Sequence, residues 1–331
     1  MQIDNPYLMF LGDAADDLAA KVANGVAKWR PDWCKGQLRL DGCKADLGLT
    51  DMSLEEAKAA GCKTVIVGVA NRGGIIPQSW LSTLEQALVM GFDVASGLHN
   101  KLSDIETLSS LAAEHGRKLF DVRHPTETFE VAKGSRRPGK RLLTVGTDCS
   151  AGKMFTSLAI EKEMRARGMK ADFRATGQTG IFIAGSGVSV DAVISDFISG
   201  ATEKLCPAND ADHWDVVEGQ GSLFHASFAG VSLGLLHGAQ PDVMVMCHEP
   251  TRTHMRGLPD FPLPSLKACI ELNERMARIV NPDARVIGVS VNTSNLPKDR
   301  QDDYLAEVEK ELGLPAVDAF RQGAGRLVDA L

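Results

Sequence analysis

The residues best suited to chemistry lie around a loop that would hold an anion. A short apolar run at 142–145 predicts a buried strand that ends at Gly146, and Gly152-Lys153 then opens a segment with helical spacing of apolar residues. In such a loop successive N–H groups surround a phosphate, the start of the helix adds favourable potential, and the Lys ammonium neutralises charge. The residues expected to bind the phosphates of a cofactor are Gly146, Thr147, Asp148, Cys149, Ser150, Ala151, Gly152, Lys153 and Met154.

This loop departs from the usual phosphate-binding pattern in two ways. Five residues instead of four separate the two glycines, and Met154 stands where a magnesium-binding Ser or Thr is expected. Thr156 is the nearest hydroxyl. Asp148, inside the loop, either caps the loop or contributes to binding a metal ion or an amine.

A second group of residues follows the predicted strand 215–217. Glu218 stands at the end of this apolar strand and is followed by Gly219 and Gly221. In phosphate-binding folds that position faces the bound phosphates, so Glu218 could hold magnesium or act as a base. The alternative is a carboxylate that accepts hydrogen bonds from the N–H groups of the turn. We expect Glu218, Asp148 and Lys153 to take part in catalysis.

A third group, at 248–257, combines two His, two Arg and one Glu after another predicted strand. Its spacing does not match a helical zinc site. Arg252 and Arg256 instead suit a small dicarboxylate, with His254 beside them, although a solvated loop is the alternative.

Two further strand ends carry candidate binding residues. Arg72, in the glycine-rich turn 71–74, is a further candidate for binding a carboxylate or a phosphate. Asn292 follows the predicted strand 286–291 and could pair with an adenine edge, or simply form a turn.

Strands that alternate with helices position these residues. The first half predicts strands at 7–11, 65–69, 92–95 and 119–122, and the second half adds strands at 171–175, 215–217, 243–247, 286–291 and 316–319. This alternation predicts two α/β domains with mainly parallel sheets, residues 1–134 being Rossmann-like and residues 135–331 carrying the phosphate loop. Because no Gly-x-Gly-x-x-Gly follows the first strand, no dinucleotide is assigned to the first domain. Residues 133–141 are expected to form a linker with solvated charges.

The composition limits the class of protein. Of 331 residues, 44% are hydrophobic and 24% charged, which is ordinary for a globular protein in solution. The net charge of −7 argues against binding nucleic acid. The longest mostly apolar stretch, 224–236, is too short to cross a membrane, and no signal peptide is visible. Seven cysteines without a Cys-x-x-Cys pair suggest neither a disulfide framework nor a zinc site. We expect a cytoplasmic protein, and a homo-oligomer as is common for such enzymes.

The phosphate loop, residues 145–153, resembles that of dethiobiotin synthetase and its relatives, which space their glycines in the same way. Residues 217–221 resemble the Val-Glu-Gly-Ala-Gly motif of that family, whose Glu binds magnesium. Asn292 falls where the family places an Asn on adenine. Met154 replaces the metal-binding Thr of that family.

Over nearly its whole length the chain is similar to a narrower family, long known only as a domain of unknown function, with a Rossmann-like N-terminal half and a P-loop C-terminal half. The resemblance is carried by residues 146–154, 191–200, 217–222 and 249–257. It implies membership of the D-glutamate N-acetyltransferase family, and therefore transfer of an acetyl group from acetyl-CoA to an acidic D-amino acid. The alternatives are an ATP- and magnesium-dependent ligase or kinase that resembles dethiobiotin synthetase, and a nucleotide-gated binding module.

Overall fold

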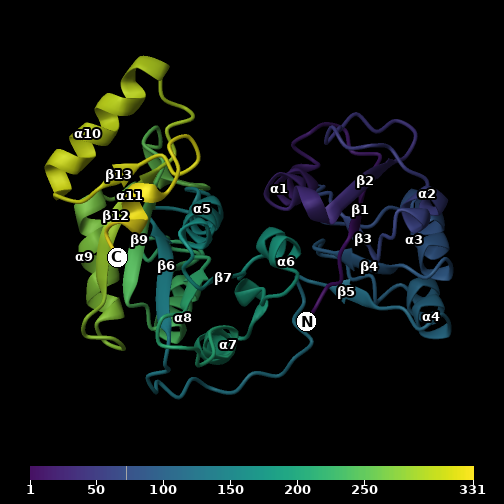
Figure 1. Ribbon diagram of the computed structural model, residues 1–331, viewed down its shortest axis with the longest axis horizontal. Helices are drawn as coiled ribbons and strands as arrows, with labels where there is room; N and C mark the ends of the chain where they lie inside the picture. The colour runs from purple at the N-terminus through teal and green to yellow at the C-terminus, as the bar shows by residue number, and fades with distance from the viewer. Residues whose placement is uncertain (72) are drawn as a thin grey trace. The chain divides into compact units, whose positions relative to one another are not determined.

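The computed structural model describes residues 1–71 and 73–331; Arg72 lies outside the described residues. The chain divides into two compact units (Figure 1). The first comprises residues 1–126 together with 177–192, and the second comprises residues 127–176 together with 193–331. Both are α/β units built on parallel sheets, which confirms the predicted fold class.

The first unit holds a five-stranded sheet in the order β2-β1-β3-β4-β5. Its strands are β1 (Tyr7–Gly12), β2 (Cys34–Arg39), β3 (Thr64–Val67), β4 (Asp93–Ser96) and β5 (Leu119–Asp121). Its helices are α1 (Lys21–Trp29), α2 (Leu54–Ala59), α3 (Gln78–Val89), α4 (Glu106–Glu114) and α6 (Gln178–Ala184). Strand β2 escaped the sequence analysis because its sequence, Cys-Lys-Gly-Gln-Leu-Arg, lies at the sheet edge and lacks an apolar run.

The second unit holds a six-stranded parallel sheet in the order β13-β12-β9-β6-β8-β7. The strands are β6 (Lys140–Gly146), β7 (Ala171–Arg174), β8 (Trp214–Val217), β9 (Val243–His248), β12 (Arg285–Val291) and β13 (Ala316–Val317). A separate antiparallel hairpin pairs β10 (His254–Met255) with β11 (Leu258–Pro262). Near-continuous burial of β6, β8, β9 and β12 explains why these strands read as apolar runs in the sequence.

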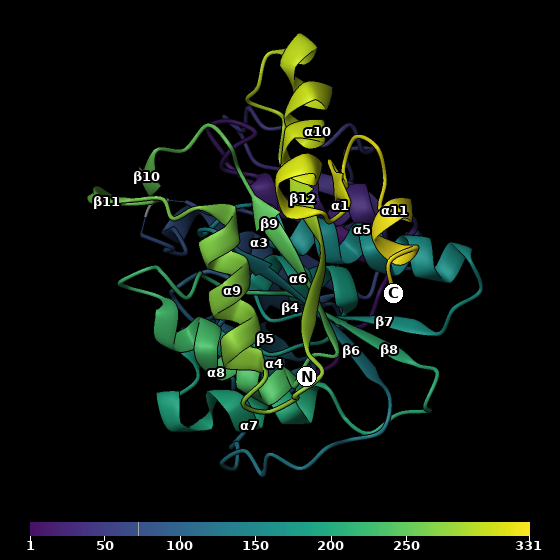
Figure 2. The same ribbon diagram turned by 90° about the vertical axis from the view of Figure 1, so that its left-hand side faces the viewer.

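Helices cover both faces of the second sheet (Figure 2). One face carries α8 and α9, with α7 packed on α8, and the other carries α5 and α11. The bounds are α5 (Lys153–Ala166), α7 (Ile198–Leu205), α8 (Ala229–Ala239), α9 (Leu266–Ala277), α10 (Gln301–Leu312) and α11 (Gly325–Val328). No helix among residues 1–71 and 73–331 has the length and apolar character needed to cross a bilayer.

The predicted linker does not leave its charges in solvent. Arg141, the second residue of β6, is 1% exposed, and its guanidinium donates to the Arg137 carbonyl at 3.0 Å. Arg137 in turn donates to the carbonyls of Cys206 at 2.9 Å and Gly238 at 2.8 Å. These carbonyls lie at the C-terminal ends of α7 and α8. Carbonyl groups at the end of a helix have no N–H partner within the helix, so the guanidinium takes that place. The prediction of solvated charges is therefore wrong for these two arginines.

Candidate active site

The phosphate loop lies where the strand order of the second sheet changes direction. From β6 the chain first goes to β7 and β8 on one side, and it then crosses to β9 on the other side. Ligands of open parallel sheets bind at such a point, beyond the carboxyl ends of the strands. Gly146, the last residue of β6, pairs with Cys247, so the loop starts beside the end of β9.

The loop leaves a row of backbone donors without internal acceptors. The amide N–H groups of residues 150–154 donate to no atom within residues 1–71 and 73–331. Ser150 and Gly152 hold left-handed conformations, with φ of +51° and +98°, and the second turns the chain directly into α5. Unpartnered N–H groups at the start of a helix are a site for an anion.

Lys153 places its ammonium inside the loop. The side chain is 6% exposed, and Nζ donates to the Asp148 carbonyl at 2.8 Å. Burial lowers the pKa of the ammonium, and the neighbouring Arg252 lowers it further, although the Asp148 carboxylate opposes both effects. An anion that binds beside this buried ammonium would stabilise its charged form.

The segment that follows β9 holds the phosphate loop through hydrogen bonds to Asp148. Asp148 is fully buried, and its Oδ2 accepts from Arg252 Nη1 at 2.7 Å and from the Arg256 amide at 2.9 Å. Arg252 also donates to the Cys149 and Ser150 carbonyls and to Glu249 Oε2. The Arg252 guanidinium, predicted to bind substrate, is thus engaged by the phosphate loop itself.

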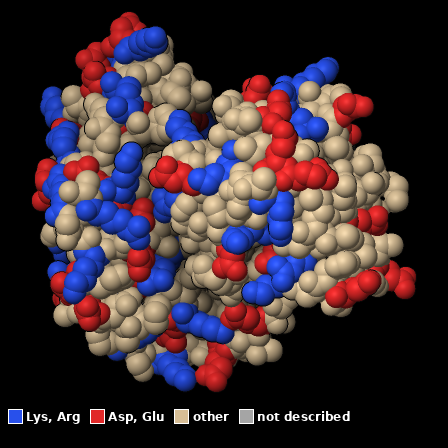
Figure 3. Space-filling model, turned by 45° about the vertical axis from the view of Figure 1, so that its right-hand side comes forward, with Lys and Arg blue, Asp and Glu red and all other residues tan. Residues whose placement is uncertain are grey.

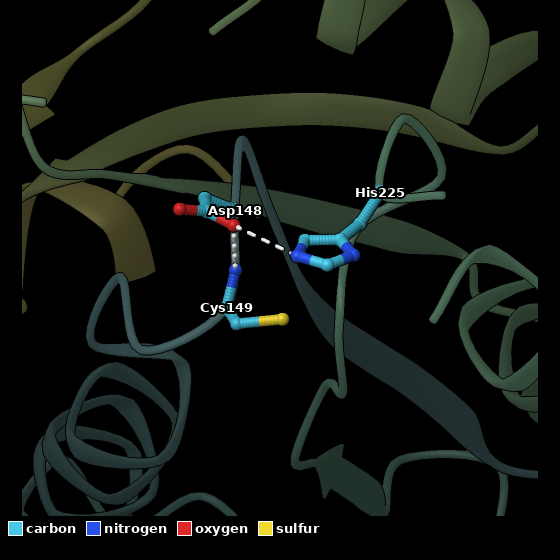
Figure 4. Close-up of side chains that lie close together, drawn as sticks. All are labelled: Asp148, Cys149 and His225. Atoms are coloured by element: carbon cyan, nitrogen blue, oxygen red, sulfur yellow. Dashed lines mark hydrogen bonds and ion pairs between the residues drawn. The ribbon is translucent and has the colours of Figure 1, made fainter. Parts of the chain in front are cut away.

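Asp148, Cys149 and His225 gather at one point (Figure 4). One ligand atom of each lies within 4.8 Å of the other two, a spacing that an ion could bridge. However, Asp148 Oδ1 accepts from the Cys149 amide at 2.6 Å, and His225 is bonded through Nε2 to the Arg256 carbonyl and through Nδ1 to the Ser227 amide. These bonds tie the Asp148 and His225 side chains to the backbone of the phosphate loop and of residues 227 and 256.

His248, at the end of β9, bridges the phosphate loop and α10. Nδ1 lies 3.0 Å from the Thr147 hydroxyl and Nε2 lies 3.1 Å from the Tyr304 hydroxyl. The position follows from the register, since Cys247 pairs with Gly146. Burial lowers the pKa of His248 to about 4, with Arg252 adding to the effect and Glu249 opposing it.

We therefore expect His248 to make the protein sensitive to acid. The unfolded chain takes up a proton on this residue near pH 6.5 and the folded chain only near pH 4, so stability should fall as the pH drops through this interval. Urea unfolding of the wild type and of His248→Gln at several pH values measures the effect. The variant should lose less stability across the interval, whereas His115→Gln, at an exposed histidine, should match the wild type. Equal losses in wild type and His248→Gln would contradict the assignment.

Glu218 is buried at the end of β8. Its Oε2 accepts from the Thr176 amide at 2.9 Å, and its carbonyl accepts from the Thr176 hydroxyl at 2.7 Å. The following Gly219 has no room for a side chain, because an added Cβ would lie 1.7 Å from the Thr144 carbonyl oxygen. The carboxylate therefore joins the ends of β7 and β8, and its predicted catalytic role stays a prediction.

The residues predicted to bind substrate lie in and near the hairpin. His254 is exposed at the start of β10, and the exposed Arg256 donates to the Ser150 hydroxyl at the phosphate loop. Arg72 lies outside the described residues. Over the face drawn in Figure 3, Lys and Arg side chains alternate with Asp and Glu, so a cationic site for an acid must be local.

Two family models match most of the chain. A P-loop domain described as "Domain of unknown function (DUF1611_C)" matches residues 130–328, and a Rossmann-like domain described as "Domain of unknown function (DUF1611_N)" matches residues 38–125. The chain belongs to the DUF1611 family.

Relatives within this family match over their full length. A protein from Tritonibacter scottomollicae is 59% identical and one from a Pseudoalteromonas species is 50% identical, each over 99% of both chains, and both are named D-glutamate N-acetyltransferase. The crystal structure of a DUF1611 family protein from Anabaena variabilis is 31% identical, covers 98% of this chain and 99% of its own, and superposes with a TM-score of 0.84.

Sequence reasoning missed several residues that build the site of this DUF1611 protein. Ser222 donates to the Thr147 carbonyl at 3.1 Å, and Tyr304 and Asp318 hold the ends of β9 and β12. Tyr304 lies on α10, far along the sequence from its partner, and no local pattern marks such a contact. Asp318 could have been identified from the sequence, because a carboxylate that directly follows a short apolar strand, here β13, is expected at the same sheet edge.

Proposed function

We propose that the protein transfers the acetyl group of acetyl-CoA to the amino group of D-glutamate. The observation that carries this proposal is the full-length identity of 59% and 50% to two relatives named D-glutamate N-acetyltransferase. Identity of this extent over 99% of each chain leaves no domain of those relatives unmatched.

The phosphate loop suits the acetyl donor. CoA carries a diphosphate and a 3′-phosphate, and the amides of residues 150–154 together with Lys153 offer donors and positive charge for one of these groups. Arg252 and His248 hydrogen-bond to Asp148 and Thr147 of the loop, and these bonds hold the amide donors in place before the ligand binds. Such preorganisation reduces the cost of binding.

The reaction itself needs few protein groups. A neutral amine attacks the thioester carbonyl, a C–N bond forms, the C–S bond breaks, and the amine loses a proton while the CoA thiolate gains one. The protein must remove a proton from the substrate ammonium, stabilise the oxyanion and hold the carboxylates. For the last task we favour Arg256, which is exposed and donates to the Ser150 hydroxyl of the phosphate loop, together with the exposed His254 two residues before it.

The direct test is an assay with purified protein, acetyl-CoA and D-glutamate. Released CoA thiol is followed by absorbance with a disulfide reagent, and N-acetyl-D-glutamate is identified by mass spectrometry. L-glutamate, D-aspartate and D-glutamine serve as comparison substrates. Product formation that required ATP and magnesium in place of acetyl-CoA would support the ligase or kinase alternative.

We expect activity to survive removal of metal ions. Met154 offers magnesium no oxygen, and the nearest hydroxyl, that of Thr156, is buried and bonded to the Ser290 hydroxyl at 2.8 Å. A hard cation requires oxygen ligands, so the loop does not fit magnesium beside the phosphates. Turnover with and without EDTA, and calorimetry of CoA and ATP in metal-free buffer, measure this. Loss of all activity in EDTA would contradict it.

Arg256→Lys should raise the KM for D-glutamate tenfold or more, about 1.4 kcal/mol of substrate binding. Arg pairs bidentately with a carboxylate, and Lys does not reproduce this geometry. The KM for acetyl-CoA should stay unchanged, and so should that for D-glutamine, which lacks the side-chain charge. If the variant keeps the wild-type preference for D-glutamate over D-glutamine, Arg256 does not hold the side-chain carboxylate, and Arg72 becomes the next candidate.

A further inference from the structure

The loop between β8 and α8 carries two exposed phenylalanines. Phe224 is 37% exposed, and Phe228, the residue before α8, is 45% exposed. The Phe228 ring packs on the buried His225 ring, with centroids 4.6 Å apart and planes at 35°. Single exposed apolar side chains are ordinary, but two large rings in one short loop offer an apolar surface to a ligand.

Hydrogen bonds join this loop both to the phosphate loop and to the hairpin. The Ser222 hydroxyl donates to the Thr147 carbonyl at 3.1 Å. His225 Nε2 lies 3.1 Å from the carbonyl oxygen of Arg256, in the turn of the hairpin. The loop is therefore held beside the anion site at one point and beside the candidate carboxylate-binding residue at another.

The first part of the same loop offers backbone donors. The amide N–H groups of residues 220–223 donate to no atom within residues 1–71 and 73–331. Gly219 comes just before them, and a Cβ added to it would lie 3.0 Å from Lys153 Cδ, so this row of donors starts next to the anion site. Backbone N–H groups without a partner in the protein require an acceptor from water or from a ligand. Along the chain, the donors come first and the two rings follow.

We propose that residues 220–228 bind the pantetheine arm of the acetyl donor. The proposal rests on the proposed function. In this arm secondary amides alternate with short apolar segments, and the arm joins the diphosphate of CoA to the thioester. The amides of residues 220–223 donate to its carbonyl oxygens, and Phe224 and Phe228 cover its apolar segments. ATP has no such arm, so this loop makes the protein prefer acetyl-CoA to ATP.

The first test compares Phe224→Ala/Phe228→Ala with the wild type by calorimetry. CoA carries the arm, whereas adenosine 3′,5′-bisphosphate carries only the nucleotide part. The double variant should bind CoA roughly tenfold more weakly or worse, because the apolar cover of the arm is lost, and it should bind the bisphosphate like the wild type. Ile279→Ala, at a residue 66% exposed after α9, is the matched control and should bind both ligands like the wild type. Unchanged CoA affinity, or an equal loss with the bisphosphate, would overturn the assignment of the rings.

A donor without adenosine gives a second readout. Acetyl-pantetheine consists of the arm and the thioester, so its KM should rise in the double variant by the same factor as the KM of acetyl-CoA. A rise with acetyl-CoA alone would show that the rings act on the nucleotide part, against the proposal.

The backbone donors can be tested one at a time. Incorporation of the matching α-hydroxy acid at each of residues 220–223 replaces the amide by an ester and keeps the side chain. At least one of these esters should weaken CoA binding roughly threefold or more and leave bisphosphate binding unchanged. The same replacement at Ala226, exposed in the same loop, is the control. If all four esters bind CoA like the control, the amides do not hold the arm.

Failure of this proposal differs from failure of the proposed function. If the wild type does not acetylate D-glutamate from acetyl-CoA, the proposed function is wrong. A wild type that binds CoA more tightly than the bisphosphate, with the difference lost in the double variant, would still assign the arm to this loop. A wild type that binds both ligands equally would overturn the proposal.

Discussion

Arg252→Ala should lower the free energy of unfolding by about 3 kcal/mol and weaken acetyl-CoA binding at the same time. The substitution leaves the fully buried Asp148 carboxylate without its guanidinium partner, 2.7 Å away. Breaking a buried ion pair by removing one member costs about 3–5 kcal/mol, and the lower end applies because Arg252 is 21% exposed. Affinity falls too, because the Cys149 and Ser150 carbonyls lose the group that holds them.

The double variant Asp148→Asn/Arg252→Ala should recover part of this loss, because the uncompensated charge is then removed. Arg278→Ala is the matched control, since Arg278 forms an exposed ion pair with Glu274 on α9 and should cost less than about 1 kcal/mol. Urea unfolding and calorimetry measure stability and affinity. If Arg252→Ala raised only the KM for D-glutamate and left stability intact, Arg252 would be a substrate ligand and not a support of the loop.

Much of the site could be predicted from the sequence because it follows from strand ends. Buried parallel strands read as apolar runs, and their carboxyl ends meet at one edge of the sheet. The phosphate loop, Glu218, His248 and Asn292 each follow such a run directly. Their positions directly after apolar strands were therefore enough to predict that they lie together at the carboxyl edge of the second sheet.

The partners of these side chains could not be predicted in the same way. Whether Arg252 faces a ligand or the phosphate loop depends on the path of the chain after β9, where a turn and a hairpin replace periodic structure. The contact of Phe155 with Phe320 joins residues far apart in the chain. The edge strand β2 was not predicted for a simpler reason. It is held by hydrogen bonds to β1, and its mostly polar sequence contains no apolar run that would indicate a strand.

Lys153→Ala should weaken acetyl-CoA binding roughly 30- to 150-fold, about 2–3 kcal/mol, the range for a charge-assisted contact. In the free protein the ammonium is buried and donates to the Asp148 carbonyl, 2.8 Å away, so it lies ready inside the loop. The free energy of unfolding should change by less than about 1 kcal/mol, because burial of this cation serves the ligand and does little for the fold. Calorimetry and urea unfolding measure the two effects.

The pH dependence of binding gives this prediction a second readout. Burial holds the pKa of Lys153 below its usual 10.5, and a bound phosphate would favour the charged form again. Affinity of the wild type should therefore be full below the lowered pKa and fall as the pH rises through it, whereas Lys153→Ala should show no such fall. Lys162→Ala, at an exposed lysine on the same helix, should keep both the affinity and the pH dependence of the wild type. Unchanged affinity in Lys153→Ala would show that the loop does not bind the phosphates of the donor.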